Sequence, residues 1–229
     1  NHHLDALVCL GGGGTQKNAF RLHKKGLNVV TLPKTIDNDV FGTEVTFGFA
    51  TALGIATEAI DRLHTTATSH DRTIVVEVMG RRCGYLALLG GLATGAERVY
   101  IHEEGVTLAD LQRDLTSMVE GFRHGKRLGL VVRAEEANPL YTTPFMYALF
   151  EQEGGDLFDV RQAILGHLQQ GGDPSPFDRI LATRFADECV KFLVREAESP
   201  TPDAVFIGGS GGPPVSGVFG RTPLSDSEG

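Results

Sequence analysis

The sequence predicts an α/β fold with mainly parallel strands. Short apolar segments typical of buried strands alternate along the chain with longer segments of helical periodicity. Apolar residues make up 41% of the 229 residues, and this length suits one good core or one and a half small domains. Several apolar segments run directly into glycines or acidic residues. Open α/β sheets bind their ligands at such strand ends.

The expected strands are short and rich in Val, Ile and Leu, and turn residues or helical segments separate them. They lie near 5–10, 27–32, 73–78, 98–102, 128–133, 160–165 and 204–207. The expected helices lie near 15–25, 46–64, 83–94, 107–122, 141–152 and 177–197.

Two of these helices carry clear signals in the sequence. The segment 46–64 has a broad apolar face from Phe47 to Ile60, and the segment 177–197 follows a Pro-Ser-Pro stop-start signal. The last stretch, 208–229, is rich in Gly, Pro and Ser and is expected to be a flexible tail.

A glycine-rich segment follows the first expected strand and opens the first expected helix. It consists of Gly11, Gly12, Gly13, Gly14 and Thr15. Glycines let backbone N–H groups approach phosphate oxygens, and a helix N-terminus adds positive potential. The segment is no Walker A loop, because no Gly-Lys-Ser/Thr follows, and four glycines alone also suit a flexible turn.

An acidic turn follows the second expected strand, with Thr35, Asp37, Asn38 and Asp39 in close succession. One carboxylate can accept a proton while the other faces a metal-bound phosphate, which suits phosphoryl transfer to a hydroxyl group. Taken alone, these residues are more typical of an ordinary polar loop. Strand, glycines, helix, strand and acidic turn in this order favour the phosphate-binding interpretation.

Charge and cysteine content exclude several classes of function. The net charge of −8 argues against a nucleic-acid or anionic-membrane surface. Cys9, Cys83 and Cys189 have no metal-binding or redox spacing, which fits a reducing cytoplasm. The apolar runs are too short to span a membrane, and no signal peptide is expected.

The chain resembles the phosphofructokinase family. The shared motifs recur in the family's order from residue 4 to about 196. They are GG-x-GT at 11–15, PKTIDND at 33–39, TFGFATA at 46–52, VEVMGR at 76–81, LGH-x-Q-x-GG at 165–172 and SPFDR at 175–179. The resemblance implies two sandwich-like α/β domains with mainly parallel sheets. Residues 1–48 with 169–200 would form the phosphoryl-donor lobe, and 49–168 the sugar-phosphate lobe.

The reaction that the resemblance implies is transfer of the γ-phosphoryl group of ATP to the 1-hydroxyl of fructose 6-phosphate. This glycolytic step needs Mg²⁺ and gives fructose 1,6-bisphosphate. Asp37 matches the family's catalytic base, and Asp39 the carboxylate near the magnesium-phosphate. Thr35 can hydrogen-bond the transferring group. Arg81 resembles the arginine that neutralises charge on that group, as a fixed cation stabilises an anionic transition state.

The same resemblance assigns the sugar-phosphate contacts. Glu135 aligns with a glutamate that bonds sugar hydroxyls, and Met79 and Gly80 shape the sugar pocket. The 6-phosphate cations are His167, Arg72 and Arg161, and the two arginines reach across from a neighbouring subunit in the family. A homotetramer or dimer with shared active sites is therefore implied. Each cation has a plainer alternative: surface ion pairs for the two arginines, and a turn histidine for His167.

Three departures from the family pattern bear on activity. Gly13 replaces a common Asp near magnesium, and Gln170 replaces a common Arg beside the phosphate site. The chain also begins at what resembles the family's third strand, so it resembles an incomplete phosphofructokinase. A non-catalytic or truncated subunit that binds a phosphosugar is therefore one alternative.

The phosphoryl donor is indicated by two residues that disagree. Gly14 leaves room for the α-phosphate of ATP, whereas Lys34 is more typical of pyrophosphate enzymes. An Asp at position 14 would exclude the α-phosphate sterically, and such a steric limit is a stronger constraint than the charge of Lys34. ATP is therefore favoured, and a pyrophosphate-dependent phosphotransferase is the alternative. Gly95, Glu97 and His64 align with effector-binding positions of the family, and allosteric regulation is left open.

Overall fold

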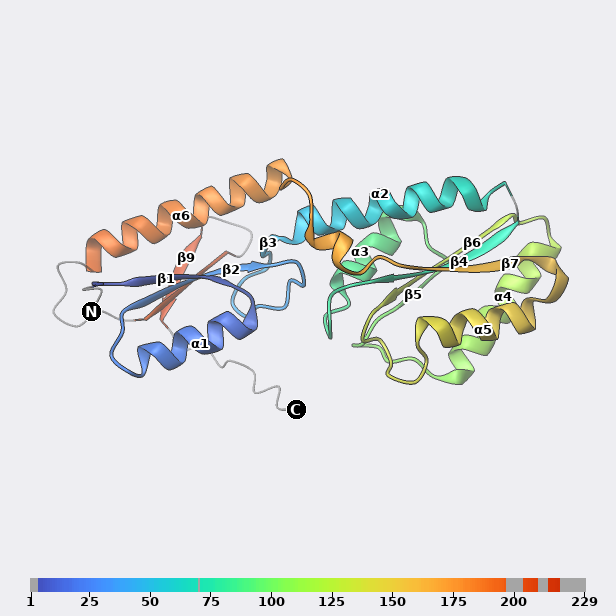
Figure 1. Cartoon of the computed structure of the whole chain (residues 1–229), viewed down its shortest axis with the longest axis horizontal. Helices are drawn as coiled ribbons and strands as arrows, with labels where there is room; N and C mark the ends of the chain where they lie inside the picture. The colour runs from blue at the N-terminus through green and yellow to red at the C-terminus, as the bar shows by residue number, and fades with distance from the viewer. Residues whose placement is uncertain (1–3, 70, 197–203, 210–213, 219–229) are drawn as a thin grey trace. The chain divides into compact units, whose positions relative to one another are not determined.

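The computed structural model describes residues 4–69, 71–196, 204–209 and 214–218. The chain forms two compact units (Figure 1). The first comprises residues 1–50 and 174–229, and the second comprises residues 51–173. The α/β class is confirmed, since helices and a sheet of mainly parallel strands occur in both units. None of the helices in the described ranges is long and apolar enough to cross a membrane.

The first unit is a sheet with helices on both faces. Its strand order is β1 (Leu7–Gly11), β2 (Val29–Thr35), β8 (Val205–Gly208) and β9 (Val215–Val218). The short β3 (Phe47–Gly48) pairs with the end of β2. Figure 1 shows α1 (Gly13–His23) and α6 (Pro176–Glu196) on opposite faces. The core is apolar and consists of Val30, Leu32, Phe47, Phe185, Cys189, Phe192, Val205 and Ile207.

The second unit has a four-stranded sheet whose paired strands are all parallel. The strand order is β5 (Arg98–Tyr100), β6 (Leu128–Ala134), β4 (Arg72–Val78) and β7 (Asp159–Ile164). The central strands β4 and β6 are almost wholly buried and rich in Val, Ile and Leu, as expected where helices cover both faces.

Among the described residues, four α-helices belong wholly or mostly to this second unit. They are α2 (Phe49–Ala67), α3 (Tyr85–Thr94), α4 (Leu108–Arg123) and α5 (Thr143–Gly154), and the short 3₁₀ helix η2 (Gly166–Gln170) follows β7. A further 3₁₀ turn, η1 (Gly155–Leu157), precedes β7. Figure 1 shows α2 on one side of the sheet and α4 and α5 on the other. Along α2, Ala52, Ala56 and Ile60 are fully buried, and this spacing of four residues points one helical face into the core.

Helix α4 begins where the sequence supplies a capping box. Thr107 accepts a hydrogen bond from the Asp110 amide, and the Asp110 carboxylate accepts one from the Thr107 amide. The hydrogen bonds from Thr107 hold the pKa of Asp110 below its usual range. A carboxylate in the first helical turn also complements the helix dipole.

The expected flexible tail at 208–229 is wrong for part of its length. Residues Val215–Val218 form β9, which pairs antiparallel with β8. Gly208 belongs to β8, and a Cβ there would lie 2.3 Å from the Gly42 carbonyl oxygen. Glycine at 208 therefore serves close packing rather than flexibility. Residues 210–213 and 219–229 of this stretch lie outside the described residues.

The expected helix over 46–64 begins later than its pattern suggested. Phe47 and Gly48 form β3 beside Lys34 and Thr35, and α2 starts at Phe49. Gly48 has φ 114°, which a helix does not allow, so the chain changes direction at this glycine. The apolar pattern did not reveal this break, because Phe47 is buried in either arrangement.

Candidate functional site

The glycine-rich segment joins β1 to α1 in the first unit. Gly12 is the N-cap residue and α1 begins at Gly13. A Cβ on Gly11 would lie 2.1 Å from the Thr15 Oγ1, and one on Gly12 would lie 3.2 Å from the Thr35 Cβ. The first two glycines thus let the loop pack against the following turn of helix and against the end of β2.

The next two glycines face open space. Apart from its chain neighbours and the nearby backbone of α1, a Cβ on Gly13 or Gly14 would have no heavy atom within 4 Å among the described residues. Both belong to the first turn of α1, where backbone N–H groups have no partner within the helix. An anion can therefore approach these amides, as the phosphate-binding interpretation requires.

Gln16 supports this loop from behind, a role that sequence reasoning missed. Its side chain is buried, and Nε2 donates to the Gly11 carbonyl at 3.3 Å and to the Leu32 carbonyl at 3.5 Å. The amide thus links the ends of β1 and β2. A glutamine in the first turn of a helix has no sequence signal that separates this role from an exposed one.

The acidic turn begins at Thr35, the last residue of β2. The Thr35 Oγ1 accepts a hydrogen bond from the Asp37 amide at 3.2 Å, and the Thr35 carbonyl accepts one from the Thr46 hydroxyl at 2.8 Å. The Asn38 Oδ1 accepts one from the Thr46 amide at 2.7 Å, and its Nδ2 donates to the Glu44 carbonyl at 2.9 Å. These bonds stabilise Asn38 at φ 56°, a conformation that asparagine tolerates better than most residues.

The two carboxylates of the turn have different surroundings. Asp37 is 7% exposed, whereas Asp39 is exposed to solvent, as is Lys34. The parallel register pairs Gly11 with Pro33, so the glycine-rich segment and the acidic turn follow neighbouring strands at the same edge of the sheet. The first unit therefore brings together an inward carboxylate, an outward carboxylate and a helix N-terminus.

The second unit brings Arg81 and Glu135 together. The strands β4 and β6 pair Val78 with Ala134, so the residues that follow them lie side by side. The Glu135 Oε1 accepts a hydrogen bond from the Arg81 amide at 2.9 Å. Arg81 has φ 51°, an uncommon conformation for a residue with a side chain, and this bond helps to hold it.

Met79 and Gly80 precede Arg81 in the same turn. Gly80 has φ 133°, and a Cβ there would lie 2.6 Å from the Cys83 carbonyl oxygen. The Gly80 carbonyl accepts a hydrogen bond from the Cys83 amide at 2.9 Å. Only glycine fits this position without moving the backbone.

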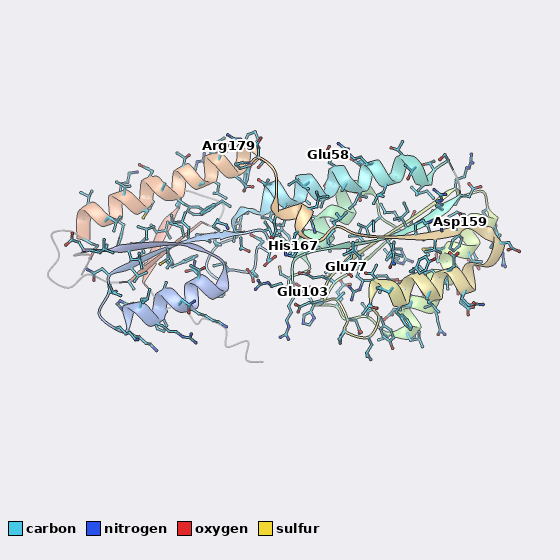
Figure 2. The ribbon with its side chains drawn as sticks, viewed as in Figure 1. Glu58, Glu77, Glu103, Asp159, His167 and Arg179 are labelled. Atoms are coloured by element: carbon cyan, nitrogen blue, oxygen red, sulfur yellow. The ribbon has the colours of Figure 1, made fainter. Side chains whose placement is uncertain are left out.

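His167 lies at the same edge of the second sheet as Arg81. It belongs to η2, which follows β7, and the Leu165 amide donates to the Glu77 carbonyl at 3.0 Å. Figure 2 shows His167 and Glu77 at one end of this unit and Asp159 at the other. The imidazole is exposed.

Arg72 and Arg161 lie near the opposite edge. Arg72 begins β4 and pairs in register with Asp159, and Arg161 is two residues further along β7. The Arg72 Nε lies 3.8 Å from the Asp159 Oδ2, and the Arg161 Nη2 lies 3.2 Å from it. Because a strand rises about 3.3 Å per residue, Arg72 is about 20 Å from the end of β4. Arg161 pairs with Ile74 and lies about 13 Å from that end. Within one chain, the strands therefore separate the backbones of both arginines from Arg81 and Glu135.

Gly11 offers a direct test of the geometry of the glycine-rich segment. We expect Gly11→Ala to lower the free energy of unfolding by about 1–3 kcal/mol, because the new methyl group would overlap the Thr15 side chain. The matched control Gly13→Ala should be neutral or stabilising, since that position is open and helical. Urea unfolding measures both. Equal stability of the two variants would contradict the packing described here.

Comparison with known proteins is consistent across sequence and structure. The family model described as Phosphofructokinase matches residues 1–193. The ATP-dependent 6-phosphofructokinase of Spirochaeta thermophila is 45% identical over 212 residues, which cover 84% of this chain and 57% of that protein. The enzyme of the same name from Dictyostelium discoideum is 47% identical over 198 residues, covering 83% of this chain and 24% of that protein.

Among solved structures, phosphofructokinase from Saccharomyces cerevisiae superimposes with a TM-score of 0.88 at 34% identity, covering 94% of this chain and 31% of that one. The chain thus spans little more than half of the bacterial relative, and a smaller share of the two eukaryotic proteins. Because the matched model extends over most of the sequence, this chain belongs to the phosphofructokinase family.

Proposed function

We propose that the protein transfers the γ-phosphoryl group of ATP to the 1-hydroxyl of fructose 6-phosphate, giving fructose 1,6-bisphosphate. The observation that carries this proposal is the pair of carboxylates in the acidic turn, Asp37 buried and Asp39 exposed, beside the N-terminus of α1. The names of the relatives support it, since they are ATP-dependent 6-phosphofructokinases. The reaction is glycolytic.

In this proposal Asp37 is the general base. It takes the proton of the 1-hydroxyl as that oxygen attacks the γ-phosphorus, and ADP leaves in line. Thr35 hydrogen-bonds the transferring group. The Arg81 guanidinium neutralises the negative charge that spreads over that group, which favours the transition state over the bound substrates.

The sugar phosphate would be held by the second unit. Glu135 accepts hydrogen bonds from sugar hydroxyls, Met79 and Gly80 line the sugar pocket, and His167 meets the 6-phosphate. Arg72 and Arg161 are proposed to serve the site of a neighbouring subunit. Their places in the sheet support this role, because Arg72 begins β4 and Arg161 pairs with Ile74, about 20 Å and about 13 Å from the end of β4. A homotetramer or dimer with shared active sites follows.

The proposed donor site comprises the glycine-rich segment, Gly11, Gly12, Gly13, Gly14 and Thr15, together with Lys34. Magnesium fits this site through Asp39, because Mg²⁺ is commonly held by one or two carboxylates together with substrate phosphates. Among the described residues, no group of three or more His, Cys, Asp or Glu residues could hold a metal by itself. When bound, the ion would neutralise phosphate charge.

The proposed setting is the cytoplasm. Among the described residues, no disulfide joins Cys9, Cys83 or Cys189, and burial raises the pKa of the Cys9 and Cys189 thiols, which keeps both in the unreactive protonated form. Cysteines outside disulfides suit a reducing compartment.

A comparison of phosphoryl donors tests this function. With fructose 6-phosphate as acceptor, we expect turnover of the purified protein with ATP and little with pyrophosphate. The open space at Gly14 leaves room for the α-phosphate of a nucleotide. Gly14→Asp should therefore lower turnover with ATP by at least about tenfold while the fold is retained. A coupled assay of fructose 1,6-bisphosphate formation measures both proteins.

The other outcomes of this assay separate the alternatives. Turnover with pyrophosphate but not with ATP would show that ATP is not the donor. The exposed Lys34 would then be assigned to binding pyrophosphate. Binding of fructose 6-phosphate without turnover by either donor would indicate a non-catalytic subunit. Gly13 and Gln170 would then explain the loss of activity, because each replaces a charged residue of the family pattern.

A further inference from the structure

Arg133 is the largest fully buried side chain of the protein's described residues and carries a charge. It is the penultimate residue of β6 and is 1% exposed. Burying a guanidinium is costly unless it is paired and fully hydrogen-bonded. Burial lowers the pKa of Arg133, and the neighbouring Glu77 carboxylate opposes this shift. The role of this buried charge is therefore inferred from the groups that pair with the guanidinium.

One partner is a carboxylate on the adjacent strand. Glu77 of β4 is the register partner of Arg133, and its Oε2 lies 2.8 Å from the Arg133 Nη1. The same oxygen accepts a hydrogen bond from the Thr143 hydroxyl at the start of α5. This pair balances the buried charge, but it involves only one edge of the guanidinium.

The remaining partners are carbonyl groups of one loop. Residues 135–142 connect β6 to α5 without regular structure. Arg133 donates to the carbonyls of Glu135 at 3.0 Å, Asn138 at 2.7 Å and Tyr141 at 3.1 Å. A planar guanidinium can reach several fixed acceptors at once, which a lysine ammonium on its flexible stem cannot do in the same geometry. Arg133 thus fixes the loop at three points from inside the core.

These bonds extend to the surface through Glu135. Its amide donates to the Val78 carbonyl at 2.9 Å and its carbonyl is held by Arg133, so its backbone is fixed on both sides. Its carboxylate then accepts from the Arg81 amide, where the backbone is left-handed. A chain of hydrogen bonds therefore runs from the buried Arg133 through Glu135 to Arg81.

We infer that Arg133 is a positioning residue that orients Glu135 for the sugar phosphate and, through Glu135, holds the turn of Arg81. This role rests on the proposed function, because that function assigns Glu135 to the sugar hydroxyls and Arg81 to the transferring phosphoryl group. This role accounts for a buried guanidinium in an apolar core. Glu77 pairs with only one of its nitrogens, and the loop carbonyls accept hydrogen bonds from all three. No sequence signal marks it, since an arginine near the end of a strand is ordinarily exposed.

Two variants separate the loop contacts from the ion pair. Glu77→Gln removes the charged partner but leaves the bonds from Arg133 to the three carbonyls, so it serves as the matched control. Adding Arg133→Met to this variant removes those bonds without leaving an unpaired buried charge, and methionine fills much of the space. Replacing both members of a buried ion pair is often tolerated, so we expect the urea midpoint of the double variant within about 1 M of the wild type.

The expected result is selective for the sugar phosphate. The double variant should raise the KM for fructose 6-phosphate at least about tenfold over Glu77→Gln, with the KM for ATP within about twofold. Arg133→Lys alone should give an intermediate value. A purely structural role would instead change both KM values together with stability. An unchanged sugar-phosphate KM in the folded double variant would overturn the inference.

Hydrogen exchange gives a second readout that needs no activity. The Ala137 amide donates to the Ala134 carbonyl at the end of β6, and the amides of Leu140 and Tyr141 donate to the Asn138 Oδ1. Their exchange should be at least about tenfold faster in the double variant than in Glu77→Gln. Wild-type protein without turnover on fructose 6-phosphate would contradict the proposed function, whereas unchanged exchange would contradict the role of Arg133. The two failures are therefore distinguishable.

Discussion

Asp37→Asn is expected to lower kcat by about 10²–10⁴-fold while the Kd for fructose 6-phosphate stays within about threefold of the wild-type value. Asparagine keeps the shape of the side chain but cannot accept the hydroxyl proton. Asp37 is buried, and the Thr35 hydroxyl accepts its amide proton, so the turn should persist in the variant. Initial rates in a coupled assay and calorimetric titration with the sugar phosphate measure the two quantities.

Glu44→Gln is the matched control for this prediction. Glu44 is an exposed carboxylate in the same connection between β2 and β3, and the replacement removes the same charge from the same loop. Its kcat should equal that of the wild type within about twofold, because an exposed charge is largely screened by solvent. A kcat within tenfold of wild type for Asp37→Asn would remove Asp37 as the base.

The first unit was largely predictable because its signals are local. A glycine-rich segment between a strand and a helix, and an acidic turn after the next strand, come to the same edge once β1 and β2 pair in parallel. The sequence could not reveal that Gln16 joins these two ends from behind. It also could not reveal β9, since a strand that pairs across a Gly-Pro-rich connection depends on the free edge of β8.

In the second unit, the sequence identified candidate site residues but did not show how far apart they lie in the fold. The resemblance assigned Arg72 and Arg161 to the 6-phosphate, yet both lie toward the opposite end of the strands from Arg81 and both are close to Asp159. The direction of the parallel strands decides this, because Arg72 begins β4 and Arg161 lies near the start of β7, whereas Arg81 follows the end of β4. Arg133 was missed for a different reason, since its burial depends on the loop folding back over it.

Arg81→Gly is expected to lower kcat by about 10²–10³-fold, the loss found when one fixed electrostatic donor is removed from a transition state. Arg81 has φ 51°, where a residue with a side chain costs about 1–2 kcal/mol. Glycine avoids this cost, but it gives up more conformational entropy on folding, which lowers the free energy of unfolding by about 0.5–1 kcal/mol. The free energy of unfolding should therefore change by less than about 1.5 kcal/mol, so a loss of activity cannot be assigned to misfolding.

The neighbouring Arg82 provides the comparison for this last prediction. Its Nε lies 3.4 Å from the Glu136 Oε2, and both side chains are at least half exposed, so their ion pair contributes little to stability. Arg82→Gln removes the same charge one residue away and should leave kcat within about threefold of wild type. If both variants lowered kcat equally, a general positive potential would explain the effect. A loss confined to Arg81→Gly would instead require that its guanidinium meet the transferring phosphoryl group directly.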